Sequence, residues 1–165
     1  MAVVVETADA DDVATITDYW IALADDQRAH GSHVLGDPSR ETIAETVRRH
    51  IARDALLVAR REDTLAGFVA MELERDGYER DCQRGRVTAL YVRPDDRSRG
   101  IGRRLLDRAE RDLAAAGAAV VALEALADND RARSLYDECG YEPHRVTYEK
   151  PIESDTHSSP ERRTP

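Results

Sequence analysis

Apolar and polar positions follow two different periods along the first half of the chain. Helical spacing predicts an amphipathic helix that starts after Thr7 and Asp9, which offer capping oxygens, and runs to about Ala29. The same spacing predicts a second helix from Ser39 to about Arg53, after a loop that contains Gly and Pro. Short apolar or alternating runs predict strands at residues 2–6, 55–61, 64–74 and 86–92.

The second half alternates between the two periods. Apolar residues at intervals of four predict an amphipathic helix over residues 100–116. Residues 118–125 are apolar up to Glu124 and predict a buried strand. A short helix is expected over residues 128–139, capped by an Asp or Asn at its start, and a last strand over residues 141–150.

The resulting order is β-α-α-β-β-β-α-β-α-β, in which a strand-helix-strand unit lies beside antiparallel hairpins. The expected fold class is therefore α/β, with a single-domain, mixed, mostly antiparallel sheet flanked by helices. We expect this domain to span residues 1–152. Residues 153–165 are rich in Ser, Pro and charge and lack apolar periodicity, which is typical of a disordered tail.

The 165 residues fit one domain with a sizeable core. The longest nearly uncharged apolar run, residues 113–123, is about half the length that a membrane span needs. The start of the chain lacks the basic flank and cleavage site of a signal peptide. With only Cys82 and Cys139, a disulfide framework is not expected, and a reducing cytoplasm is the expected location.

The 33 acidic residues outnumber the 24 basic ones, so the formal net charge is −9. Of the basic residues, 23 are Arg and one is Lys150. A salt-rich cytoplasm favours this balance, because carboxylates hold hydration where salt screens repulsion; a high-GC genome is the alternative, which explains the Arg better than the acidity. The Arg residues are dispersed among acids without aromatic residues between them, so nucleic acid is not an expected partner; with no apolar run long enough to span it, a membrane is not expected either.

Residues 97–104, Arg-Ser-Arg-Gly-Ile-Gly-Arg-Arg, lie between an expected strand and the amphipathic helix. Two glycines there let the backbone turn tightly and leave N–H groups at the helix start free to bind an anion, best a phosphate. Five Arg and two Asp give residues 93–104 a charge of +3 within an acidic chain. The stretch matches neither the dinucleotide fingerprint nor the P-loop, and a plain turn with solvated Arg side chains is the alternative.

A second informative stretch, residues 129–143, spans the short helix and the residues directly after it. Together the two stretches resemble the Gcn5-related N-acetyltransferase (GNAT) superfamily, whose phosphate-loop motif is Gln/Arg-x-x-Gly-x-Gly/Ala and whose later motif is Asn, Ala, Leu-Tyr and Gly-Phe/Tyr. The matching residues here are Arg97, Gly100 and Gly102 in the first motif and Asn129, Ala132, Leu135-Tyr136 and Gly140-Tyr141 in the second. The order of elements agrees with the family over about residues 2–150.

The resemblance implies acetyl-CoA as the acetyl donor, with no metal. In the family, the backbone N–H groups of the loop hold the pyrophosphate, and the preceding strand pairs with the pantetheine arm as an added strand would. The corresponding residues here are Arg97, Arg99, Gly100, Ile101, Gly102, Arg103 and Arg104 in the loop, and Leu90 and Val92 in the strand. Asn129 is expected either to contact the cofactor or simply to cap its helix.

The resemblance also implies the catalytic groups of a direct attack by a neutral amine on the thioester. Tyr136 is the expected proton donor to the leaving thiolate, the alternative being an aromatic residue that packs the short helix; the Val92 N–H is expected to stabilise the oxyanion. Histone-type relatives carry a Glu as base where this chain has Arg86. Glu124 is the base candidate, because burial at the end of an apolar strand would raise its pKa; a solvated strand end and a water chain to bulk are the alternatives.

The acceptor is expected to be a small-molecule or peptide amine. In the family, the connection between the first two helices borders the acceptor pocket, so Trp20, His30 and His33 are candidates for substrate contact or for loop lining. His30 and His33 have no carboxylate or thiol at ligand spacing, and a metal site is not expected. A homodimer is plausible, since many relatives pair. The alternative function is a non-catalytic module of the same fold that binds or senses acyl-CoA.

The charge balance makes a testable prediction about stability. We expect the melting temperature to rise between dilute buffer and molar KCl, because added salt screens the repulsion within a chain of net charge −9. Thermal unfolding followed by circular dichroism across a KCl series measures this. A melting temperature that stays flat or falls over the series would contradict salt adaptation.

Overall fold

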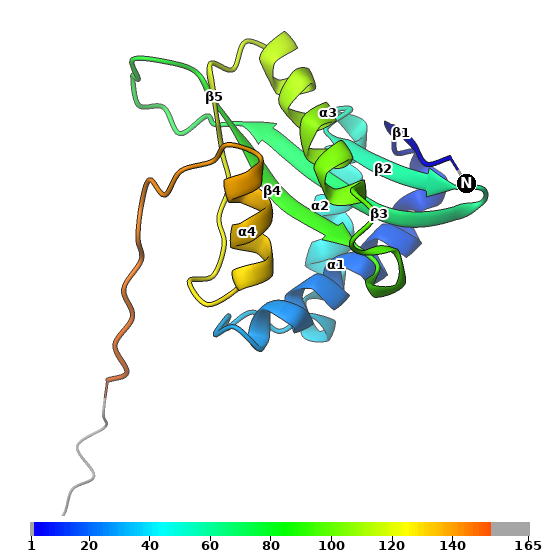
Figure 1. Ribbon diagram of the computed structural model, residues 1–165, viewed down its shortest axis with the longest axis horizontal. Helices are drawn as coiled ribbons and strands as arrows, with labels where there is room; N and C mark the ends of the chain where they lie inside the picture. Colours follow the sequence, from blue (N-terminus) through cyan, green and yellow to red (C-terminus); the bar gives the residue numbers. More distant parts are fainter. Residues whose placement is uncertain (1, 153–165) are drawn as a thin grey trace, which may run out of the picture.

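The computed structural model describes residues 2–152 and contains a five-stranded sheet (Figure 1). The strands, in their spatial order, are β1 (Val4–Thr7), β2 (Leu56–Arg61), β3 (Thr64–Leu73), β4 (Arg84–Val92) and β5 (Val120–Ala122). Neighbours from β1 to β4 are antiparallel, whereas β5 is parallel to β4. The sheet is thus mixed and mostly antiparallel.

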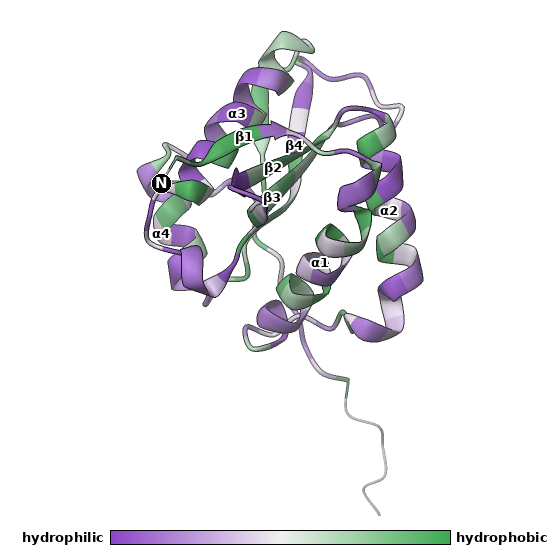
Figure 2. Cartoon of the chain, turned by 90° about the vertical axis from the view of Figure 1, so that its right-hand side faces the viewer, coloured by the Kyte–Doolittle hydropathy of each residue, from purple (hydrophilic) through white to green (hydrophobic). Residues whose placement is uncertain are grey.

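Two pairs of helices cover the opposite faces of this sheet (Figure 2). The helices are α1 (Val13–Arg28) and α2 (Arg40–Ala52) on one face, and α3 (Ile101–Ala115) and α4 (Asp130–Glu138) on the other. Short 3-10 helices at Ala10–Asp12, Asp37–Ser39 and Pro94–Asp96 precede α1, α2 and α3. The expected fold class is confirmed.

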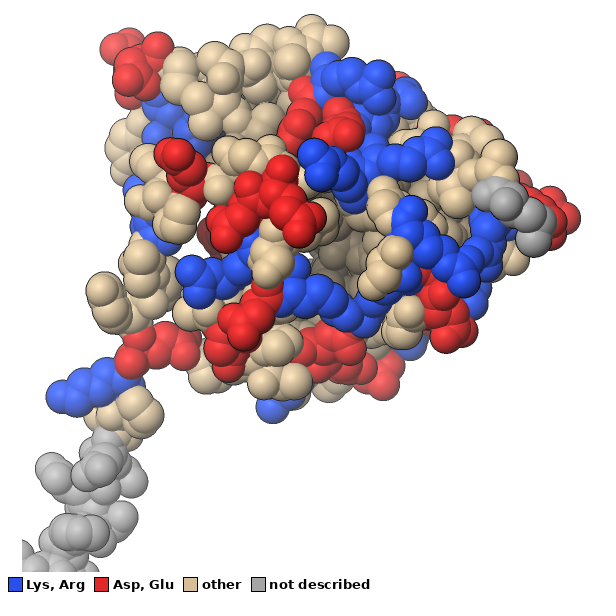
Figure 3. Space-filling model, viewed as in Figure 1, with Lys and Arg blue, Asp and Glu red and all other residues tan. Residues whose placement is uncertain are grey.

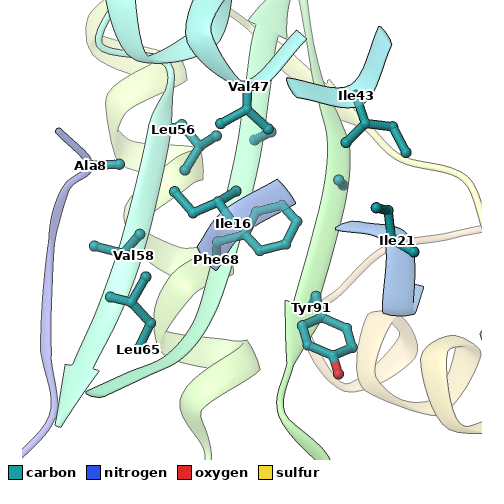
Figure 4. Packing of buried hydrophobic residues seen from close by; sticks show 12 residues of the cluster. Ala8, Ile16, Ile21, Ile43, Val47, Leu56, Val58, Leu65, Phe68 and Tyr91 are labelled. Atoms are coloured by element: carbon teal, nitrogen blue, oxygen red, sulfur yellow. The ribbon is translucent and has the colours of Figure 1, made fainter. Parts of the chain in front are cut away.

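The side chains of β3 alternate between two cores. Phe68 and Ala70 belong to the core beneath α1 and α2 (Figure 4), whereas Val69 and Met71 belong to the core beneath α3. Because helices cover both faces, residues 65–71 are all buried, and their sequence is almost continuously apolar, as expected of a central strand. The two cores hold β3 and β4 in fixed positions at the centre of the sheet.

β4 is bound tightly on one side only. Along that side it pairs with β3, and Gly67 lies so close that a Cβ atom there would come within 2.3 Å of the Tyr91 carbonyl oxygen. On the other side, β4 pairs with β5 only at residues 84–86. Residues 87–92 therefore leave an open edge directly before the start of α3.

The elements after α3 differ from the sequence expectation. The strand expected at residues 118–125 is reduced to Val120–Ala122, and none of residues 118–125 is buried. The last strand expected at residues 141–150 is wrong, because these residues form no strand. Within residues 2–152, β5 pairs with three residues of β4 and has no strand on its outer edge, so nothing covers residues 118–125 from that side.

The boundary expected at residue 152 coincides with the end of the described residues, and residues 153–165 lie outside them. The domain limits and the disordered tail therefore stay predictions. Within residues 2–152, no helix combines the length and the apolar character that crossing a membrane requires.

Candidate active site

The chain between β4 and α3 turns so that the start of α3 is exposed; we call residues 93–104 the β4–α3 junction. Gly100 is the N-cap residue in the left-handed conformation (φ +78°), and no side chain caps the helix. The N–H groups of Ile101, Gly102 and Arg103 have no backbone partner among residues 2–152. Free N–H groups at the positive end of a helix bind anions.

Cations surround this helix start. Arg99, Arg103 and Arg104 form no ion pair within the part of the chain that the structure describes, whereas Arg93 and Arg97 are paired with acids. A pocket of about 390 Å³ beside the junction is lined by Ala2, Val3, Arg61, Arg99, Ile101 and Arg104. Figure 3 shows Lys and Arg side chains gathered around a hollow on the face that carries α3 and α4. The junction thus offers an anion both hydrogen-bond donors and positive charge.

The guanidinium of Arg97 points back into the protein. Its Nε donates a hydrogen bond to the Val92 carbonyl oxygen (2.9 Å), and its Nη2 donates one to the carboxylate of Asp26 in α1 (3.2 Å). The guanidinium also lies over the ring of Tyr91, 5.6 Å from the ring centroid. These contacts tie the junction to β4 and α1, so the Arg97 side chain positions the loop.

A buried carboxylate anchors the same junction from below. Asp96 is fully buried. Its carboxylate forms an ion pair with Arg61 at the end of β2 (2.8 Å) and a longer ion pair with Arg93 (3.5 Å). Removing Arg61 would leave the buried Asp96 carboxylate with only the longer ion pair to Arg93, which is unfavourable. Sequence analysis missed Asp96 and Asp26, because no local pattern shows which distant Arg an acid meets.

The open edge of β4 presents main-chain groups beside the junction. The Arg93 N–H donates to the Ala66 carbonyl oxygen of β3 (2.8 Å), so this N–H points toward β3. Peptide groups of consecutive strand residues point to opposite edges, and those of Val92 and Leu90 therefore face the open side. The Val92 carbonyl oxygen is occupied by Arg97. The Val92 N–H and the main-chain N–H and C=O of Leu90 are therefore available to pair with an added strand.

α4 brings Tyr136 to this region. Gly102 separates β4 from α4, because a Cβ atom at Gly102 would lie 3.4 Å from Leu135 and 3.7 Å from Val92. Tyr136 packs onto the same core as Val92, and Tyr141 donates a hydrogen bond to Glu110 of α3 (2.7 Å), which ties α4 to α3. Burial raises the pKa of the Tyr136 phenol, so the hydroxyl is protonated at neutral pH.

Asn129 acts as a helix cap. Its side-chain oxygen accepts a hydrogen bond from the Ala132 N–H (3.2 Å), the usual geometry of an N-cap. This contact fixes the start of α4, and with it the direction in which the helix carries Tyr136.

The burial expected for Glu124 is wrong. Its side chain is 91% exposed and lies 3.7 Å from the guanidinium of Arg86. The strand that was to bury it ends at Ala122, before Glu124 is reached. Burial therefore does not adapt this carboxylate to act as a base.

The three residues expected near the acceptor, Trp20, His30 and His33, have different surroundings in the structure. Trp20 belongs to the core, where it stacks on Phe68 with ring centroids 5.5 Å apart, so it supports the fold. His30, after α1, contacts Asp128 before α4 (3.1 Å), and His33 contacts Glu149 (2.9 Å). The connection between α1 and α2 therefore lies beside the start of α4, and substrate contact by His30 and His33 stays a prediction. Among residues 2–152, no group of three or more His, Cys, Asp or Glu could hold a metal ion.

In this mixed α/β sheet, an open strand edge lies next to a helix start whose first N–H groups have no backbone partner within residues 2–152, an arrangement suited to an extended, anionic ligand. The family model described as Acetyltransferase (GNAT) family matches residues 14–141. The chain belongs to this family.

Individual relatives agree with this assignment. The chain is similar to an acetyltransferase from Sodalis glossinidius, 40% identical over 62 residues, which cover 38% of this chain and 44% of that protein. The chain thus matches less than half the length of this curated relative. Among solved structures, it resembles a GCN5-related N-acetyltransferase from Ralstonia eutropha JMP134 with a TM-score of 0.71 and 22% identity over 92% of this chain and 99% of that one. It also resembles a predicted acetyltransferase with acetyl-CoA from Clostridium acetobutylicum, with a TM-score of 0.71 and 16% identity over 91% of this chain and 96% of that one.

The position of Gly102 makes a prediction about CoA binding. We expect Gly102→Val to weaken CoA affinity at least tenfold, since a branched side chain would enter the space between β4 and α4 and obstruct the approach to the helix N–H groups. Gly102→Ala, whose Cβ makes only ordinary contacts, is the matched control and should lose less. Equal CoA affinities of the wild type and Gly102→Val, measured by calorimetry, would contradict the assignment of the junction as a phosphate site.

Proposed function

We propose that the protein is an N-acetyltransferase that moves the acetyl group of acetyl-CoA to a primary amine within a ternary complex. The observation that carries this proposal is the open edge of β4, which leads directly into the uncapped start of α3. Family membership supplies the donor, because acyl transfer from acetyl-CoA is what the GNAT family implies.

The donor is proposed to lie along the β4–α3 junction. The CoA pyrophosphate accepts hydrogen bonds from the N–H groups of residues 101–103, and Arg99, Arg103 and Arg104 balance its charge. The pantetheine arm pairs with the main-chain groups of Leu90 and Val92 as an added strand would. This arrangement brings the thioester to the end of β4 and under α4.

The transfer is proposed to proceed by direct attack. The nitrogen lone pair of a neutral amine forms a bond to the thioester carbon, and the carbonyl oxygen becomes an oxyanion that accepts a hydrogen bond from the Val92 N–H. The nitrogen then loses a proton, the carbon–sulfur bond breaks, and the sulfur leaves with the bonding electrons as a thiolate. The products are an amide and, once that thiolate is protonated, CoA.

Tyr136 is proposed to supply the proton that the thiolate takes. The residue is in the matching position of the family motif, and its raised pKa keeps the hydroxyl protonated and ready to donate. A phenol is a weaker acid than a thiol, so the donation depends on the close position of the hydroxyl and on the site around it. Solvent returns a proton to Tyr136 before the next cycle.

The acceptor amine is proposed to lose its protons to water. Glu124, the base candidate from the sequence, has an exposed side chain that meets Arg86, and the histone-type Glu is replaced by that same Arg86. The acceptor is proposed to enter beside His30, where the connection between α1 and α2 meets the chain before α4. The proposed substrate class is a primary amine. Thiol release measured with a panel of amines would identify the acceptor.

The role of Tyr136 makes a kinetic prediction. We expect Tyr136→Phe to lower kcat by about 10²- to 10⁴-fold while the KM for acetyl-CoA changes little, because the donated proton acts only in the transition state. Steady-state release of CoA thiol measures this. The loss should shrink with acyl donors whose thiols are more acidic, because such thiols leave without a proton.

Tyr141→Phe is the matched control. It removes the hydroxyl of a neighbouring tyrosine, whose ring centroid lies 6.1 Å from that of Tyr136, and breaks its hydrogen bond to Glu110, so it should cost about 1 kcal/mol of stability but leave kcat nearly unchanged. A Tyr136→Phe protein with full kcat would make Tyr136 a packing residue. Tight CoA binding without thiol release for any amine would instead favour an acyl-CoA-binding module.

A further inference from the structure

A second groove lies between the first strand of the sheet and α3; we call it the β1–α3 groove. Its volume is about 330 Å³, and its lining consists of Val3, Val4, Val5, Arg104, Asp107, Arg108 and Arg111. It shares Val3 and Arg104 with the pocket beside the β4–α3 junction, so the two hollows adjoin. The acetyl transfer proposed above uses the junction and leaves this groove without a role.

One wall of the groove is a free strand edge. Within residues 2–152, β1 pairs with β2 alone. The Ala8 N–H donates to the Leu56 carbonyl oxygen of β2 (2.9 Å), and main-chain groups alternate in direction along a strand, so those of Val5 point away from β2. In agreement, the Val5 carbonyl oxygen accepts a long hydrogen bond from Arg108 of α3 (3.4 Å). An edge with free main-chain groups is a template for another strand.

The other wall of the groove is basic. Arg104, Arg108 and Arg111 follow one another at intervals of four and three, which places them on one side of α3. Arg108 is paired with Asp112 (3.0 Å), whereas Arg104 and Arg111 form no ion pair within residues 2–152. Figure 3 shows Lys and Arg side chains gathered over α3 and toward β1.

The charge of the groove is opposite to that of the chain. Its lining contains three Arg and one Asp, a net charge of +2, whereas the whole chain has a net charge of −9. Basic side chains that gather along a free strand edge of an acidic protein favour an occupant that is both extended and anionic.

We propose that the β1–α3 groove binds an extended acidic segment of another protein, which adds to β1 as a further strand. Side chains alternate between the faces of a strand, and those of Val3 and Val5 pack on the α3 side of the sheet. Every second residue of the added strand therefore faces the Arg side chains of α3 and is an Asp or Glu. The residues between them lie on the face of Val4, whose side chain is 53% exposed, and are apolar.

A protein strand fits this groove better than a nucleic acid or CoA does. The edge of β1 presents main-chain donors and acceptors at the spacing of a strand, which another backbone matches. No aromatic side chain lines the groove, so a base would have no ring on which to stack. Arg111 lies ten residues after the start of α3 at Ile101, which is about 15 Å along the helix axis and away from the pyrophosphate site.

The test is the binding of a fluorescein-labelled peptide of alternating glutamate and valine to the full chain, followed by fluorescence anisotropy in about 0.15 M KCl. We expect Arg111→Glu to weaken binding about tenfold or more, because an attraction becomes a repulsion. Its side chain is exposed, so the fold should be retained. Arg48→Glu is the matched control, since it makes the same charge change at an exposed position of α2, on the opposite face of the sheet, and should leave the affinity nearly unchanged.

A rearranged peptide separates strand pairing from charge alone. A peptide of the same composition, with its glutamates and valines in consecutive pairs, should bind markedly more weakly, because its acids cannot all face α3. Equal binding of the two peptides, or no binding of the alternating one, would overturn the proposal. Tighter binding of a single-stranded oligonucleotide, or displacement of the peptide by CoA, would also overturn it, because the groove would then belong to another ligand.

Hydrogen exchange shows whether the edge of β1 takes part. The Val5 amide should exchange rapidly in the free protein and become protected when the peptide is added, and this protection should be lost in Arg111→Glu. A Val5 amide that is already protected without peptide would contradict the proposal, because a second copy or another segment would then cover the edge. None of these measurements depends on acetyl transfer, and calorimetry with CoA tests the junction separately.

Discussion

The structure depends on the unequal pairing of the two edges of β4. One edge is bound to β3 along the strand, and at Gly67 the two backbones lie too close to admit a side chain. The other edge of β4 pairs with β5 over only three residues. A strand held rigidly on one side and free on the other offers main-chain groups to a ligand without giving up its own position, which is the preorganisation that binding and catalysis require.

The β4–α3 junction converts this edge into a site. Gly100 in the left-handed conformation exposes the first N–H groups of α3, while ion pairs fix the turn around them. Asp96 is held by Arg61 from below, and Arg97 links Val92 to Asp26. Arg61 and Arg97 therefore hold the loop in position. Arg99, Arg103 and Arg104, which form no ion pair within residues 2–152, remain for an anion.

The sequence alone predicted those features of the fold and the site that local patterns determine. Helical spacing, strand alternation and the two motifs gave the order of elements up to α4, the uncapped helix start at Gly100 and the position of Tyr136 on the last helix. The roles of Trp20 and Arg97 could not be read in this way, because a stacking ring and a distant acid are set by tertiary contacts. The burial of Glu124 and the last strand were expected from apolar runs, but burial needs a neighbour, and within residues 2–152 β5 has none on its outer edge.

The most direct test of the site is to follow the backbone amides while CoA is added to the ¹⁵N-labelled protein. The account predicts that the amide resonances of Gly102 and Arg103 shift most, because their N–H groups receive the pyrophosphate, and that those of Leu90 and Val92 shift with the same affinity. Shifts confined to residues around Arg61 and β1, with the junction amides unmoved, would contradict it.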